Sequence, residues 1–293
     1  EGYFDLSPRI NRDDSVSTET TMILDLVIKA IRTDEVISGA IQDLAAGANS
    51  RIALPKGAIP YVAGVVAQSK PVVLIAATER AAQDIASSLR DFITESDIAV
   101  FPAWETLPHE RLSPSSDTVG RRMAVLRRLA HPEDLGPIRV LVTSARAFIQ
   151  PIVADLGEIP PLKITAGEIL DLEQLVTELA RLGFERVELV DRRGQFAVRG
   201  GIVDVFPPAE EHPLRVEFWG DTVEEIRAFS IVDQRSTGVE VTSILATACR
   251  ELLITEQVAD RASKLAQQHP ELSEMLEKIA VGIAVEGMES LIP

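Results

Sequence analysis

The sequence has little of what covalent or metal-bound structure needs. Its 293 residues include one cysteine, Cys249, which excludes an internal disulfide and any site built from several cysteines. A lone thiol is typical of proteins from a reducing compartment, so we expect a cytoplasmic protein. The 4 histidines stand singly, and none has a second histidine or a cysteine at metal-ligand spacing. We predict no bound metal and no cofactor.

Long apolar runs and excess positive charge are also missing. Apolar stretches such as 71–77 and 140–142 end far short of the roughly 20 residues that cross a bilayer, and we expect no membrane contact. Lysine and arginine number 29 against 45 acidic residues, which gives a net charge of −16. Affinity for nucleic acid comes from cations that displace the counterions of phosphates. The charge therefore disfavours DNA binding by the chain as a whole.

A phosphate-binding loop is missing from the turn where a nucleotide-binding domain would carry one. This first predicted strand-to-helix turn, residues 54–61, reads LPKGAIPY. Ile59, Pro60 and Tyr61 replace the Gly-Lys-Thr/Ser triplet that would hold the β- and γ-phosphates. Proline also removes a backbone donor from the anion cradle. We interpret Lys56 as an ordinary solvated lysine and predict no ATP site.

Signatures of catalysis are missing as well. Ser113 and Ser144 lack the Gly-x-Ser-x-Gly elbow that exposes a nucleophilic serine. The adjacent glutamates at 210–211 and 224–225 are typical of solvated turns and faces, where acid/base work is rare. We therefore predict no catalytic residue, and no enzyme activity for this chain.

What the sequence does contain is a change of pattern along its length. Residues 1–21 are mostly polar without periodicity, and we treat them as a flexible leader, native or of recombinant origin. Residues 22–160 alternate strand-like and helical segments, which predicts an α/β domain with a mostly parallel sheet. Its expected strands are 51–54, 72–75, 98–101 and 139–142, and its expected helices include 79–93 and 117–130.

The pattern switches after Pro160 and Pro161. Residues 161–246 begin with an expected helix at 171–182 and continue as short strands with frequent turn signals, which predicts a small α+β domain with an antiparallel meander. Its expected strands are 187–190, 196–198, 202–206, 214–219 and 223–229. Residues 247–293 are helical again, with expected helices at 256–268 and 271–280, and we expect them to pack back on the first domain. We interpret the chain as a piece of a larger protein.

Two segments are more specific than these patterns. The first, Phe101–Pro114, reads FPAWETLPHERLSP, and the second, Arg193–Pro207, reads RGQFAVRGGIVDVFP and is followed by RVEFWGD at 215–221. Together they resemble the amino-terminal region of bacterial transcription-repair coupling factors, the Mfd family. That region is itself similar to the damage-recognition protein UvrB. The resemblance runs from about residue 45 to the end of the chain.

The resemblance implies a fold and a partner. The expected fold is a degenerate P-loop NTPase-like parallel sheet domain with an inserted smaller α+β domain, arranged as in UvrB. Residues 22–160 would match its domain 1a, 161–246 its domain 2 and 247–293 its domain 1b. Domain 2 is the part that UvrB and Mfd both use to contact UvrA, so the implied role is recruitment of UvrA to stalled transcription complexes in nucleotide excision repair.

The resemblance also implies what this chain does not carry. The ATP-dependent DNA translocase of the family, and its contacts with RNA polymerase and double-stranded DNA, would lie beyond Pro293. UvrB itself is the nearest competing identity. It should have an intact phosphate loop and an aromatic-rich hairpin that clamps DNA, whereas the tyrosines of this chain, Tyr3 and Tyr61, lie outside any such hairpin.

Three residues are predicted to contact UvrA. Strand alternation turns Arg186 outward, away from the side of Val187 and Leu189. Arg199 precedes the pair Gly200-Gly201, and arginine suits interfaces because its planar fork holds a carboxylate with two bonds. The resemblance supports both arginines and adds Phe206 as an apolar anchor.

Each prediction has a plainer alternative. The two arginines could pair with neighbours such as Glu188 or Asp204, and Phe206 could be an ordinary core aromatic. For the chain as a whole, the alternatives are a relic DNA-binding surface through Arg121 and Arg122, or a nucleotide-binding enzyme. The negative charge counts against the DNA-binding surface, and the sequence of the 54–61 turn counts against the nucleotide-binding enzyme.

Trp104 is expected to fill a domain interface.

The altered turn leads to a direct test. We expect the purified chain neither to bind nor to hydrolyse ATP, because the groups that hold the terminal phosphates and magnesium are replaced at residues 59–61. Isothermal titration calorimetry with Mg-ATP checks this. Binding at micromolar concentration would contradict the prediction.

Overall fold

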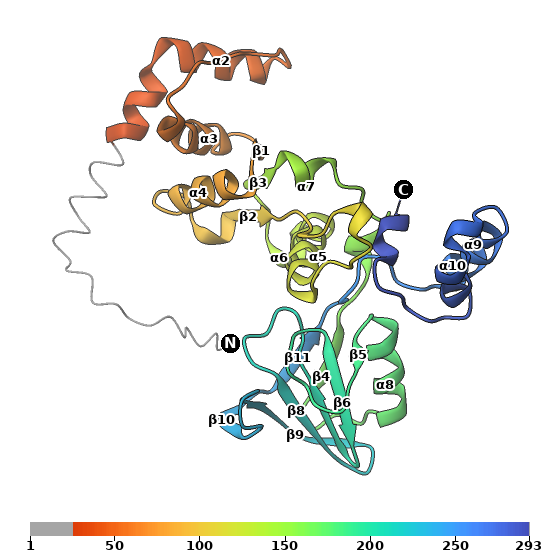
Figure 1. Ribbon diagram of the computed structural model, residues 1–293. Coiled ribbons are helices and arrows are strands. Elements are labelled where there is room, and N and C mark those ends of the chain that lie inside the picture. Colours follow the sequence, from red (N-terminus) through yellow and green to blue (C-terminus); the bar gives the residue numbers. More distant parts are fainter. Residues whose placement is uncertain (1–25, 293) are drawn as a thin grey trace. The chain divides into compact units, whose positions relative to one another are not determined.

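The computed structural model describes residues 26–292 (Figure 1). By backbone contacts the chain divides into two compact units. Within the described residues, the first contains 26–74, Arg80–Ala99 and Ile138–Val142, and the second contains Ile75–Glu79, Val100–Pro137 and 143–292. The predicted leader, 1–21, lies outside the described residues. The predicted domain borders near residues 160 and 246 stay a prediction.

A three-stranded parallel sheet confirms the expected α/β pattern. Its strands are β1 (Val72–Ala76), β2 (Ile98–Phe101) and β3 (Val140–Ser144), in the order β1-β3-β2. At the starts of these strands, the N–H of Val72 donates to the carbonyl of Arg139 (2.8 Å). The N–H of Arg139 in turn donates to the carbonyl of Asp97 (2.9 Å). The three strands therefore begin at one edge. The connections run through α4 (Glu79–Leu89) and α5 (Ser116–Ala130).

The expected strand at 51–54 is not formed. Residues 51–55 have no regular structure, and the chain passes through η1 (Lys56–Ala58) into α3 (Ile59–Ala67). Pro55 follows the apolar run directly, and proline has no N–H to donate to a sheet, so this short segment has little to gain from pairing.

In the same unit, the ring of Tyr61 stacks on Phe92 with 4.9 Å between centroids. The helix α2 (Glu35–Ala45) is capped by Asp34.

The second unit contains the expected antiparallel meander. Five consecutive strands pair in sequence order: β6 (Gln195–Arg199), β7 (Ile202–Val205), β8 (Leu214–Trp219), β9 (Thr222–Phe229) and β10 (Ser236–Glu240). The short β5 (Glu185–Arg186) adds to the edge next to β6 in parallel orientation. A separate ribbon pairs β4 (Leu162–Thr165) with β11 (Ser243–Ala246).

The expected strand at 187–190 is wrong. Pairing stops after Arg186, and the chain bends away from the sheet. Two interactions favour the bend. Val190 is fully buried in a small apolar cluster, and the side chain of Gln195 accepts from the N–H groups of Asp191 (3.0 Å) and Arg192 (3.2 Å). These bonds satisfy donors that a strand would have left at an open edge.

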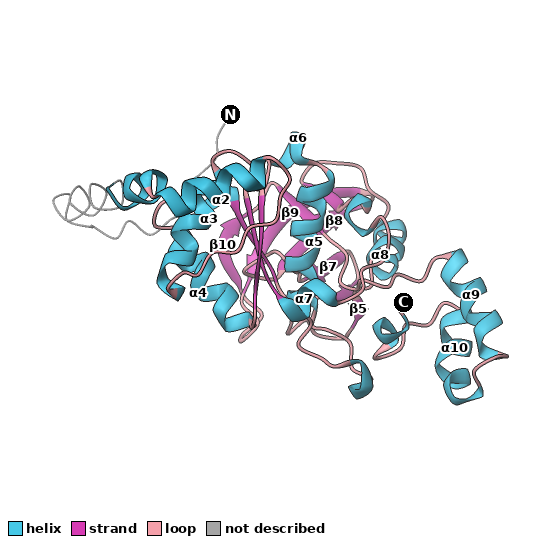
Figure 2. Cartoon of the chain, turned by 90° about the horizontal axis from the view of Figure 1, so that it is seen from above, coloured by secondary structure: helices cyan, strands magenta, loops and turns pink. Residues whose placement is uncertain are grey.

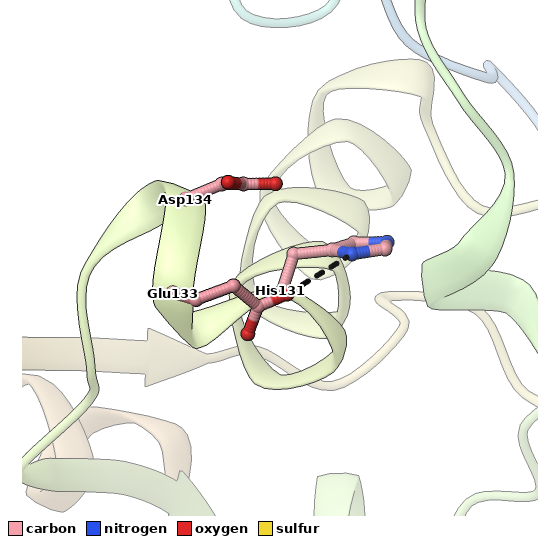
Figure 3. A group of neighbouring side chains, drawn as sticks. All are labelled: His131, Glu133 and Asp134. Atoms are coloured by element: carbon pink, nitrogen blue, oxygen red, sulfur yellow. Dashed lines mark ion pairs between the residues drawn. The ribbon is translucent and has the colours of Figure 1, made fainter.

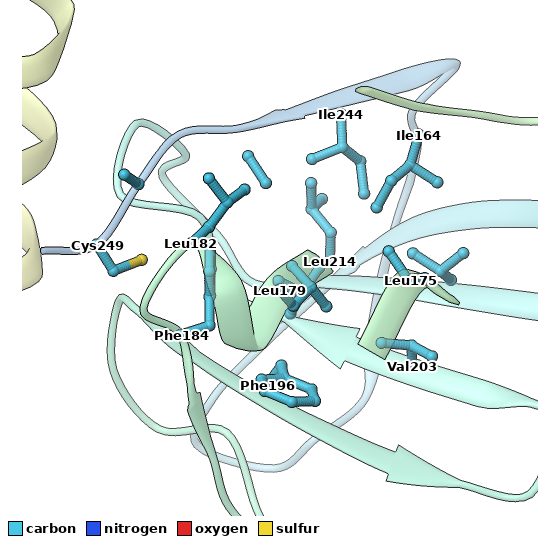
Figure 4. Packing of buried hydrophobic residues seen from close by; sticks show 14 of the residues in the cluster. Ile164, Leu175, Leu179, Leu182, Phe184, Phe196, Val203, Leu214, Ile244 and Cys249 are labelled. Carbon is cyan, nitrogen blue, oxygen red and sulfur yellow. The ribbon is translucent and has the colours of Figure 1, made fainter. Parts of the chain in front are cut away.

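One hydrophobic core organises the second unit. The helix α8 (Leu172–Arg181), capped by Asp171, turns Leu175 and Leu179 toward Phe196 and Leu214 of the sheet (Figure 4). A fully buried leucine contributes about 1.5–3 kcal/mol relative to an exposed one. The same core takes Val119 and Met123 from α5, so a helix that follows β2 in sequence belongs to the packing of the meander.

The chain ends in two helices that lie side by side, α9 (Glu256–Ala266) and α10 (Ser273–Ala280) (Figure 2). They confirm the expected helices at 256–268 and 271–280 within a few residues. Ala262, Leu276 and Ile279 share an apolar cluster of their own. Whether they pack on the first predicted domain stays a prediction. None of the helices within residues 26–292 combines the length and apolar character needed to cross a membrane.

A buried ion pair joins distant segments of the second unit. Arg122 on α5 and Glu251 are both fully buried, and the guanidinium donates to both carboxylate oxygens. Arg122 Nη1 also donates to the carbonyl of Pro102 (2.9 Å), and the indole N–H of Trp104 donates to Glu251 (2.8 Å). The guanidinium carbon lies 4.2 Å from the ring centre of Phe101. Arg122 therefore has a structural role and is inaccessible to DNA, which overturns its part in the relic DNA-binding alternative.

This pair generates a stability prediction with a built-in control. We expect Arg122→Ala to lower the free energy of unfolding by about 3–5 kcal/mol, because it leaves the Glu251 carboxylate buried without its partner. Chemical denaturation followed by circular dichroism measures the loss. Arg121→Ala removes the neighbouring arginine, which is exposed and paired with Asp117 at 2.9 Å. It should cost less than about 1 kcal/mol.

Equal losses in the Arg121 and Arg122 variants would contradict a special role for the buried pair. A further variant with Arg122→Met and Glu251→Leu together should be less destabilised than either single change, because neither charge is then left unpaired.

Candidate protein-interaction site

Two exposed arginines mark one edge of the six-stranded sheet. Arg186 lies on the edge strand β5 and Arg199 at the end of its neighbour β6. Arg199 Nη2 donates to the backbone carbonyl of Glu188 (2.8 Å). Within residues 26–292, no carboxylate forms an ion pair with either arginine. We call this β5–β6 border, with Arg186 and Arg199, the arginine edge. Both cationic groups are available to an external carboxylate.

The alternative in which Arg199 pairs with Asp204 is wrong. Asp204 is held instead by Arg215, through two bonds of 2.7 and 2.9 Å, and its side chain is almost fully buried. The hydrogen bond with Asp204, helped by the nearby acidic charges, raises the pKa of Arg215 above its ordinary value. Next to this pair, Arg227 bridges Glu217 (3.0 Å) and Glu225 (2.8 Å). On the face of the sheet that carries Asp204 and Arg215, the charges of the central strands are therefore already paired with one another.

Pairing register places the two arginines on different sides of the sheet. Arg186 is in register with Phe196, whose ring faces the α8 core, whereas Arg199 shares the opposite side with Ala197. They therefore lie along the same border of the sheet, but on opposite faces of it. The expectation that Leu189 faces inward with Val187 is also wrong, because the chain has left the sheet and Leu189 is 48% exposed.

Phe206 does not lie on the surface. Its side chain is 5% exposed and packs with Val190, Ala197 and Phe229. The guanidinium of Arg193 lies 5.0 Å from the centre of the ring. A direct contact between this ring and a partner would require the covering groups to move. The predicted contact stays a prediction, and its burial favours a supporting role beneath the surface.

The carboxyl ends of the parallel strands, where α/β sheets commonly bind ligands, are occupied by side chains of the protein. Glu79 accepts from the backbone N–H of Ala103 (3.1 Å) and from the hydroxyl of Ser144. Gln150 accepts from the N–H of Trp104 (2.9 Å). Ser144 also caps the short helix α7 (Ala145–Ile149). These groups satisfy one another, and Ser144 has a structural partner instead of a catalytic one.

One group of side chains within residues 26–292 comes close enough to share a metal ion. His131, Glu133 and Asp134 place one possible ligand atom each within 4.8 Å of one another, at the start of the short helix α6 (Pro132–Leu135) (Figure 3). The sequence gives no signal for this group, because no second histidine or cysteine lies at metal-ligand spacing from His131. Both carboxylates are exposed, and His131 Nε2 already lies 3.2 Å from Glu158. We assign no metal to this group.

The single cysteine is buried in the main core. Cys249 is 2% exposed, and burial raises the pKa of its thiol well above the ordinary value. The thiolate is the reactive form of cysteine, so this residue is a poor nucleophile in the folded chain. The arginine edge, by contrast, presents exposed cationic groups that can bind a carboxylate.

Comparison with known proteins agrees with this description. Residues 162–248, which contain the meander, match the UvrB interaction domain. The transcription-repair-coupling factor of Mycobacterium tuberculosis is 48% identical over 251 residues, which is 82% of this chain and 20% of that protein. Those of Myxococcus xanthus and Bacillus subtilis are 31% and 30% identical, over 76% and 66% of this chain and 20% and 16% of their own lengths.

The match over residues 162–248 defines the class of this protein as one that carries a UvrB interaction domain. The chain belongs to the family of bacterial transcription-repair coupling factors, and it corresponds to their amino-terminal region. It spans about a fifth of the length of the relatives it matches.

The buried thiol gives a prediction about reactivity and pH. At pH 8 we expect Cys249 to react with Ellman's reagent only after the chain is unfolded by denaturant. The unfolded thiol ionises near a pKa of about 8.5, whereas the folded thiol keeps its proton. Unfolding then releases a proton, so the free energy of unfolding should fall as pH rises above that value.

The variant Cys249→Ala isolates this contribution, because it should show a shallower loss of stability between pH 8 and 10 than the parent chain. Rapid modification of the native chain, or identical pH profiles for the two proteins, would contradict the assignment.

Proposed function

We propose that this chain binds UvrA through the arginine edge, and so recruits UvrA to stalled transcription complexes in nucleotide excision repair. The observation that carries the proposal is the pair of exposed arginines without carboxylate partners on a UvrB interaction domain. A buried charge pair at an interface gives specificity, because each partner's charge is left unpaired with any other protein. Arginine also gives up its hydration more easily than lysine.

The proposal assigns the three-stranded sheet a scaffolding role. In this view it is a degenerate nucleotide-binding fold of the UvrB type, in which the 54–61 turn has lost its phosphate loop. Pro60 lies in the first turn of α3 and offers no N–H, and Tyr61 packs against Phe92. The chain then has no chemistry of its own and acts as a non-catalytic module in the cytoplasm. Because the chain spans about a fifth of the length of its relatives, we assign contacts with RNA polymerase and double-stranded DNA to other regions of the full-length protein.

The relic DNA-binding function is not favoured. Arg122 is fully buried, Arg121 is paired with Asp117, and the chain carries a net charge of −16. A surface that tracks phosphates needs several exposed cations without acidic neighbours.

The proposal is tested by replacing both arginines of the edge. We expect Arg186→Ala with Arg199→Ala to weaken UvrA binding by about 2–5 kcal/mol, because the carboxylates of UvrA would be left desolvated and unpaired. This is a loss of at least about tenfold in affinity, measured by calorimetry or biolayer interferometry with purified UvrA. The melting temperature should change little, because both side chains are exposed and exposed pairs contribute little to folding.

A matched control is Arg235→Ala, which removes an exposed arginine next to β10, at the opposite edge of the sheet. It should leave UvrA affinity unchanged. Phe206→Ala separates the two roles of that residue. A ring in a supporting position predicts a lower melting temperature together with weaker binding, whereas a direct anchor predicts weaker binding alone. Normal UvrA affinity in the folded double arginine variant would place the docking surface elsewhere.

A further inference from the structure

An uncovered tryptophan lies at the end of the sheet that carries Arg199. Trp219 is the last residue of β8, at the Gly220-Asp221 turn into β9, and its side chain is 79% exposed. The other tryptophan, Trp104, is 4% exposed. Large exposed aromatic side chains are unusual on a folded surface, and tryptophan is enriched among the residues that dominate protein interfaces.

A second apolar side chain is held beside Trp219. Thr222 pairs with Trp219 on one side and with Ile169 on the other, so the three residues form a row on one face of the sheet. Ile169 is 85% exposed. Its place is fixed by the backbone, since the N–H of Leu170 donates to the carbonyl of Asp221 (2.8 Å). The indole and the isoleucine thus form an ordered apolar row, which we call the tip row.

The tip row and Arg199 share one face. Arg199 pairs with Ile202, Ile202 pairs with Glu217, and Trp219 follows Glu217 by two residues on the same side. With strands about 4.8 Å apart and a rise of about 3.3 Å per residue, Trp219 lies roughly 10 Å across the sheet from Arg199 and about 7 Å along it. The turn between them is Gly200-Gly201, which has no side chain to cover the gap.

The two ends of this face differ in whether the chain covers their apolar side chains. At the far end, Phe206 and Phe229 are covered by Val190 and by the guanidinium groups of Arg193 and Arg215. At the tip end, no described residue buries the indole of Trp219 or the side chain of Ile169. The chain therefore covers one apolar end of the face with its own loop and leaves the other open.

We propose that the tip row is the apolar anchor of the UvrA-binding surface, continuous with the arginine edge at Arg199. This rests on the proposed binding of UvrA. The matching surface of UvrA would place an apolar pocket roughly 12 Å from the carboxylate that receives Arg199, as the strand spacing and the rise per residue require. An indole in such a pocket, next to a desolvated arginine pair, is the arrangement typical of the residues that dominate binding energy.

The first experiment measures affinity. We expect Trp219→Ala to weaken binding of purified UvrA at least about tenfold, whereas Trp219→Phe retains most of the affinity. Thermal unfolding should be unchanged in both variants, because the side chain is exposed. Val232→Ala is the matched control: its side chain is 91% exposed, and it follows the far end of β9. It should bind UvrA normally.

The second experiment watches the two tryptophans directly. The chain labelled with 5-fluorotryptophan gives two fluorine resonances, and Trp219→Phe identifies one of them. On addition of unlabelled UvrA, the Trp219 signal should lose its sensitivity to exchange of H₂O for D₂O, while the Trp104 signal keeps its native shift.

The outcomes separate the two proposals. If UvrA binds with normal affinity to Trp219→Ala, or leaves the Trp219 resonance exposed to solvent, the tip row is not the anchor, although UvrA binding itself stands. If the double arginine variant loses binding while Trp219→Ala does not, the arginine edge acts without this anchor. If the parent chain does not bind UvrA at all, both proposals fail.

Discussion

The packing of the second unit depends on the charge pair between Arg122 and Glu251. Both groups are fully buried, so each is tolerable only while the other is in place. The pair is 129 residues apart in sequence, and its geometry is fixed further by the carbonyl of Pro102 and the indole N–H of Trp104. It therefore holds α5 against the loop that follows β11 and contains Cys249 and Glu251. Since α5 also contributes Val119 and Met123 to the main core, the ion pair and the apolar packing together connect α5 to the meander.

Because the buried side of the sheet supplies its stability, the exposed side chains can serve binding instead of folding. The α8 side of the sheet is filled by leucines and phenylalanine, and the middle of the opposite face is neutralised by the Asp204–Arg215 pair. Unpaired cations and uncovered apolar groups are left for the border and the tip, where they contribute little to folding. On the proposed binding surface, affinity for a partner can then change through Arg186, Arg199 or Trp219 without a change in stability. This separation is what an interaction module needs, because its binding groups must face water until the partner arrives.

The sequence predicts most where the signal is local. The apolar spacing of the α8 segment predicts the helix within a residue of its ends, and the turn residues predict the meander. Failures occur where a distant partner decides. Residues 51–54 have the composition of a strand but no pairing neighbour, and residues 187–190 leave the sheet because Val190 and Gln195 offer better contacts. Nothing local distinguishes Arg121 from Arg122, although one is exposed and the other fully buried.

The same limit explains why Phe206 is the apolar anchor expected from the sequence resemblance, whereas our proposal places the anchor at Trp219. Phe206 and Trp219 each lie at the end of a strand on the same face of the sheet, and both are large and apolar, so their local sequences favour neither as a surface anchor. What separates them is cover. The chain bends after Arg186 and lays Val190 over Phe206, whereas the Gly200-Gly201 turn beside Trp219 has no side chain to offer. Whether a side chain is covered depends on the folded chain and on loops that are remote in sequence. An anchor chosen from strand position alone therefore falls on either residue, and the proposal of Trp219 rests on the fact that its side chain is uncovered in the folded chain.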